Sequence, residues 1–134
     1  MCLEKGSLLF IAIISSVITY VLSQQWKQGP VRASAVVALI GAVSIMVFKE
    51  QLPVFYIQNI PLVVIGASFV GMSTTHTMHH LLQVGLAGLI FGIFYLFSSR
   101  YFHGFGGALG LSACMAVLIS IAVMKLVKRF INPD

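Results

Sequence analysis

The chain has 134 residues, of which 59% are hydrophobic and 8% are charged, whereas a soluble domain carries roughly 25% charged residues. A soluble protein this small would expose apolar surface to water and aggregate, so the composition excludes a water-soluble domain and indicates an integral membrane protein. The net charge of +5 does not indicate nucleic-acid binding, because the basic residues are mostly scattered singly at the ends of apolar runs.

Five apolar runs follow one another along the chain. They predict an all-α, multi-pass transmembrane domain of four to five helices in a cell membrane. At ~1.5 Å per residue, such a run covers most of a ~30 Å hydrocarbon core. The runs cover about residues 8–23, 31–48, 55–73, 81–97 and 109–127.

The residues after the first run are typical of a membrane interface. Trp26 and Lys27 stand among glutamines, at the level where aromatic and basic side chains meet lipid head groups. We therefore expect a retained helix rather than a signal peptide. The second run begins after Gly29, and Pro30 is well placed to start its helix.

The third run leaves two alternatives open. Asn59 and Pro61 are typical of a helix start, and the apolar stretch that follows them, Ile60 to Met72, is short for a membrane crossing. This segment would be a short central or re-entrant helix, with its backbone ends covered by protein or by a wet cavity. A spanning helix would instead begin near Phe55 and would have to bury Gln58 and Asn59.

Runs one and four align with each other without a gap, and the runs that follow them align after a shift of three residues. This pattern predicts two helical hairpins related by an internal repeat. A spanning central segment inverts the second hairpin, as in many transporter folds, whereas a re-entrant segment leaves the hairpins parallel. Either arrangement places five of the eight Lys and Arg residues on one side, so charge does not decide. The aligned pairs include Ala12 with Ala87, Tyr20 with Tyr95, Ser23 with Ser98, Gly29 with Gly104 and Ala38 with Ala116.

Acidic residues are missing from the apolar runs. Glu4, Glu50 and Asp134 lie at termini or run ends, so no carboxylate within the membrane can couple transport to protons. No carboxylate pair is present for general acid–base catalysis. The sequence therefore does not favour an enzyme, and we expect no cofactor.

Three histidines precede the fourth run. On a helix, His76 and His80 share a face and His79 lies beside it, a spacing that can hold zinc, copper or nickel. No acidic or thiolate ligand accompanies them. The alternative is a polar interfacial loop in which Thr74 or Thr75 caps the helix of the fourth run.

Small residues form stripes at helical spacing, which allow helices to approach closely within lipid. For helix packing we expect Ser34, Ala38, Gly41, Gly85, Gly88 and Gly92. A second group combines glycines and hydroxyls in and beside the third run with hydroxyls of the first, as in broken segments that build ion sites from backbone groups. For a path or ion site we expect Gly66, Ser68, Gly71, Ser73, Thr74, Thr75, Ser15 and Thr19.

These patterns lead to two functional hypotheses. The first is a channel or transporter-like protein for an ion or small solute, because of the repeat and the glycine-rich third run. The second is a non-catalytic structural or accessory subunit of a larger membrane complex, because charged residues lie only at or near the ends of the apolar runs and none lies within the membrane interior. Under either hypothesis the partners are the lipid bilayer and further protein chains, in a homo-oligomer or a membrane complex.

Overall fold

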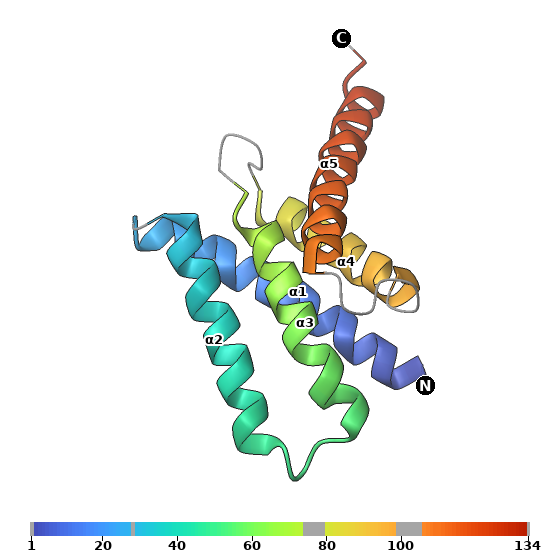
Figure 1. The fold of residues 1–134 in the computed structure, drawn as a ribbon. Coiled ribbons are helices and arrows are strands. Elements are labelled where there is room, and N and C mark those ends of the chain that lie inside the picture. Colours follow the sequence, from blue (N-terminus) through green and yellow to red (C-terminus); the bar gives the residue numbers. More distant parts are fainter. Residues whose placement is uncertain (1, 28, 74–79, 99–105, 134) are drawn as a thin grey trace.

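The computed structural model describes residues 2–27, 29–73, 80–98 and 106–133. This part of the chain is all-helical, without strands, and has five helices that are long and apolar enough to cross a membrane. The all-α, multi-pass prediction is thereby confirmed at this level. The helices are α1 (Cys2–Gln25), α2 (Pro30–Phe48), α3 (Val54–Gly71), α4 (Leu81–Ser98) and α5 (Gly106–Ile131) (Figure 1).

The third helix is continuous and begins earlier than Asn59 and Pro61 indicate. α3 starts at Val54, and Pro61 lies within it. Of the two alternatives, the helix that begins near Phe55 is therefore confirmed in its start, and a start at Asn59 is wrong. Both polar groups of the Asn59 side chain are hydrogen-bonded at this position within the helix. Its Nδ2 donates to the Phe55 carbonyl at 2.7 Å, and its Oδ1 accepts from the Tyr95 hydroxyl at 2.8 Å.

α1 and α4 run antiparallel, whereas α1 and α3 run in the same general direction (Figure 1). Gly88 and Gly92 of α4 lie against Ala12 and Leu9 of α1, respectively, so residue numbers rise along one helix as they fall along the other. Ser120 of α5 donates to the Gln83 carbonyl near the start of α4. α1 lies at the centre of the bundle and packs most extensively against α4 and α3.

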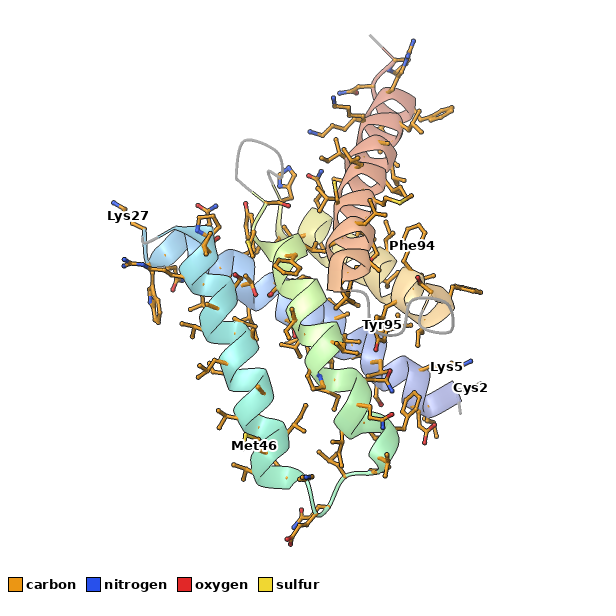
Figure 2. The ribbon with its side chains drawn as sticks, viewed as in Figure 1. Cys2, Lys5, Lys27, Met46, Phe94 and Tyr95 are labelled. Carbon is orange, nitrogen blue, oxygen red and sulfur yellow. The ribbon has the colours of Figure 1, made fainter. Side chains whose placement is uncertain are left out.

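The interior of the helix bundle is apolar, and its charged residues lie near the helix ends. The core consists of alanine, branched aliphatic and aromatic side chains from α1, α3, α4 and α5, with Phe91 as its largest fully buried member. Figure 2 shows Lys5 and Lys27 near the two ends of α1, both extending away from the bundle. This distribution is the one expected of a helix bundle that crosses a bilayer.

The bond between Tyr95 and Asn59 ties α4 to α3 within the apolar region. We expect Tyr95→Phe to lower the free energy of unfolding by about 1 kcal/mol, because the Asn59 oxygen loses its partner from α4. The measurement is a titration with sodium dodecyl sulfate followed by circular dichroism. Ser44→Ala is the control, because the exposed Ser44 hydroxyl donates to Ile40 of its own helix. Equal stability of Tyr95→Phe and the parent would contradict this role.

Candidate functional site

Buried hydroxyls gather on α1 where it meets α3 and α4. Ser15, Ser16 and Thr19 are all buried, and Ser16 and Thr19 are completely inaccessible. From α3, Ser68 is also buried, and Gly71 follows it by one turn on the segment that packs against α1. We call these five residues, together with Gly88 of α4, the α1 seam.

Glycines let the three helices of the seam approach at backbone distance. A Cβ atom added to Gly71 would lie 2.5 Å from the Ser16 carbonyl oxygen and 2.6 Å from Cβ of Thr19. A Cβ atom added to Gly88 would meet the Ser16 hydroxyl and lie 3.1 Å from the Ala12 carbonyl oxygen. The seam is therefore closed, since no larger side chain fits at either glycine without a shift.

Three of the four seam hydroxyls donate to carbonyls of their own helices. Ser16 donates to Ile13 at 2.8 Å, and its oxygen lies 3.5 Å from the Val84 carbonyl of α4. Thr19 donates to Ser15 at 2.8 Å, and Ser68 donates to Ile65 at 2.6 Å. Each hydroxyl has a single donor but two acceptor lone pairs. With its proton engaged, each oxygen remains an acceptor.

The expected path residues are distributed over the end of α3. Gly66 lies against the Phe91 ring of α4. Ser73 follows the helix and donates to the Val70 carbonyl at 2.9 Å. The segment from Gly66 to Gly71 is regular helix rather than a broken one. Thr74 and Thr75 lie outside the described residues.

The expected packing residues of α2 and α4 differ in how closely they approach their neighbours. A Cβ atom at Gly41 would lie 2.8 Å from Val64 of α3, and one at Gly92 would lie 2.7 Å from Leu9 of α1. Gly85 has only ordinary contacts, at 3.8 Å or more. On α2, Ser34 is buried and Ala38 is half-buried.

The histidine prediction falls largely outside the described part of the chain. His76 and His79 are not described, and His80 is exposed just before α4. Among the described residues, no group of three or more histidine, cysteine or carboxylate side chains could hold a metal ion. The two cysteines described, Cys2 and Cys114, are exposed and unpaired with each other.

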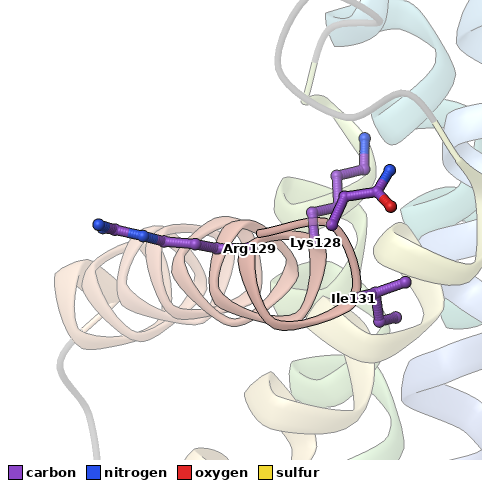
Figure 3. Close-up of a pocket in the computed structure, with 4 residues that line it drawn as sticks. Lys128, Arg129 and Ile131 are labelled. Carbon is purple, nitrogen blue, oxygen red and sulfur yellow. The ribbon is translucent and has the colours of Figure 1, made fainter. Parts of the chain in front are cut away.

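An open recess of about 650 Å³ lies beside the end of α5, a helix that contributes no residue to the seam. It is lined by Lys128, Arg129, Ile131 and Asn132. Figure 3 shows Lys128 and Arg129 extending from the helix in different directions. One helix end supplies all of these residues, so the recess is not an enclosed ligand site.

Comparison with known proteins finds no match to a family model, a curated protein or a solved structure.

Sequence reasoning missed Ser16, although it is the seam residue in contact with both neighbouring helices. The hydroxyl stripe was assigned to Ser15 and Thr19 at a spacing of four. The signal for Ser16 was the series Ala12, Ser16 and Thr19, whose spacing of four and three places small residues on one helix face. That face matches Gly88 and Gly92 on α4.

Proposed function

We propose that this protein is a small membrane transport protein, of channel or transporter type, whose solute passes along the α1 seam in a conformation in which α1, α3 and α4 lie further apart. The observation that carries the proposal is the gathering of Ser15, Ser16, Thr19 and Ser68 in the interior of an otherwise apolar bundle. Polar groups within a membrane protein commonly face the interior of the bundle, where they mark ion and substrate paths.

The chemistry of the seam favours a cation or a small solute that donates hydrogen bonds. The hydroxyls of Ser16, Thr19 and Ser68 use their protons on backbone carbonyls, so they offer oxygen lone pairs rather than donors to a solute. Hydroxyl and carbonyl oxygens are the groups that replace the hydration shell of a cation in selectivity filters.

The arrangement of the two expected hairpins supports the same proposal. α1 and α4, the first helices of the two hairpins, cross in antiparallel directions close to Ala12 and Ala87, which the repeat aligns and which are both fully buried. The aligned tyrosines, Tyr20 and Tyr95, are also buried, with 6% and 7% of their surface exposed. Inverted repeats that meet at the substrate site are typical of secondary transporters.

Thr19→Val tests the proposal, because valine keeps the shape that packs against Gly71 and removes the hydroxyl. We expect flux of a monovalent cation into liposomes to fall by about tenfold, the cost of losing one hydrogen-bonding oxygen at a charged solute. Ser44→Ala, which removes an exposed hydroxyl on α2, should leave flux unchanged. Parent flux no faster than in protein-free liposomes, or full flux in Thr19→Val, would refute the assignment.

A second candidate function is an accessory subunit of a larger membrane complex. It is favoured by the large exposed surfaces of α2 and α5. In the most apolar 18-residue stretch of each helix, only 22% of the residues of α2 and 17% of those of α5 are buried. Lipid or further helices, from identical chains or another protein, would cover these faces. The mass of the native complex in mild detergent tests it, since a monomer or pure homo-oligomer that conducts would exclude this function.

A further inference from the structure

The last turns of α5 extend beyond the other helices. The helix has 26 residues, about 39 Å at ~1.5 Å per residue. Ser120 is bonded to Gln83, the third residue of α4, so the chain after Ser120 runs past the start of α4. Figure 1 shows this end of α5 projecting away from the bundle. All residues from Lys125 to Asn132 are exposed.

This projecting end is amphipathic. Lys125, Lys128 and Arg129 follow the spacing of three and four that places side chains on one face of a helix. We call these three residues the basic tip. At ~100° per residue, the opposite face carries only apolar side chains. They are Val123, Leu126, Val127, Phe130 and Ile131, all exposed, with Phe130 exposed by 86%.

The described carboxylates are remote from the basic tip. Glu4 and Glu50 stand at the start of α1 and just after α2, toward the opposite end of the bundle. Figure 2 also shows Lys27, at the end of α1, on another side of the bundle from the end of α5. Among the described residues, the basic tip is therefore a cationic cluster of its own.

The position of the basic tip along α5 matches the depth of lipid head groups. α4 has 18 residues, about 27 Å, close to the ~30 Å hydrocarbon core. Arg129 is nine residues beyond Ser120, about 14 Å along the axis. An upright helix would carry Phe130 into water, whereas a helix inclined into the interface buries that face and turns the cations outward.

We propose that the basic tip of α5 binds the head groups of anionic phospholipids at this end of the bundle. The apolar face holds the helix in the boundary between head groups and acyl chains, and Lys125, Lys128 and Arg129 select negative head groups over zwitterionic ones. This surface is separate from the α1 seam and does not depend on transport.

The test uses the full chain in phosphatidylcholine bilayers that contain either spin-labelled phosphatidylglycerol or spin-labelled phosphatidylcholine. Electron paramagnetic resonance measures the fraction of each lipid that the protein immobilises. We expect phosphatidylglycerol to be preferred at low salt. The preference should fall in Lys128→Gln/Arg129→Gln by up to about fivefold for each cation removed.

The matched control is Lys5→Gln/Lys49→Gln, which removes the same charge from the opposite end of the bundle. It should keep the preference. The parent protein offers a second readout that does not depend on how a variant folds. Its preference should largely disappear at about 1 M salt, where the screening length is ~3 Å. A parent without preference at low salt, or equal losses in the two double variants, would overturn the proposal.

Discussion

Gly71→Ala is expected to lower the free energy of unfolding by about 3 kcal/mol, the upper part of the range for overpacking a core. The added methyl group would lie 2.5 Å from the Ser16 carbonyl oxygen and 2.6 Å from Cβ of Thr19. Neither atom can rotate away, because one belongs to the backbone and the other is the first atom of its side chain. α1 and α3 must therefore separate along the seam. Sodium dodecyl sulfate titration followed by circular dichroism measures the loss.

Gly107→Ala is the matched control for this substitution. It adds the same methyl group to a helical glycine, and no atom of the described residues outside the adjoining helix backbone lies within 4 Å of the new position. Alanine is favoured over glycine within a helix by up to about 1 kcal/mol, so this variant should be as stable as the parent or more stable. If Gly71→Ala were also as stable as the parent, α1 and α3 would not be in close contact at Ser16.

The five helices could be predicted from the sequence, and the ends of α2 and α4 within one residue, but the ends of α1 and α5 could not. Apolar runs record where the chain lies in hydrocarbon, and the structure has a helix over each of them. α1 and α5 continue beyond their runs, α5 through Lys128 and Arg129 to Ile131. Lysine and arginine are good helix formers, so a charge marks departure from the hydrocarbon and not the end of a helix.

The third helix shows how a local signal loses to tertiary contacts. Asn59 and Pro61 are typical of a helix start, yet the helix begins at Val54. The decisive partner of Asn59 is Tyr95, which is 36 residues away. No pattern within the third run contains that information, because the bond exists only when α3 and α4 pack together.

The seam explains why the role of small residues was hard to predict. Gly66 and Gly71 were assigned to a path, whereas in the structure they lie against Phe91, Ser16 and Thr19. Glycine is required in two different situations: where backbone atoms line a binding site, and where two helices come into close contact. The spacing of glycines alone cannot distinguish these two uses. Substitutions that remove a hydroxyl and preserve packing can distinguish them.

Gly88→Ala should lower the free energy of unfolding by about 2 kcal/mol, and a second substitution should restore part of that loss. The new methyl group would meet the Ser16 hydroxyl, which is held in place by its bond to Ile13, and overpacking costs typically 1–3 kcal/mol. Ser16→Ala removes the obstructing oxygen. We expect the double variant to recover about 1 kcal/mol in a double-mutant cycle, measured by the same detergent titration.

Gly85→Ala, one turn earlier on the same helix, distinguishes a specific contact from a general effect of alanine in α4. Its methyl group would lie 3.8 Å from Ile13 and 3.9 Å from Val17, which are ordinary packing distances. Gly85→Ala should be as stable as the parent. Ser16→Ala should change the free energy of unfolding by the same amount in Gly85→Ala as in the parent. If Ser16→Ala restored no stability in Gly88→Ala, the α1–α4 contact would be centred on another residue. The Ala12 carbonyl oxygen, 3.1 Å from the new methyl group, would then be the atom that limits the approach of the two helices.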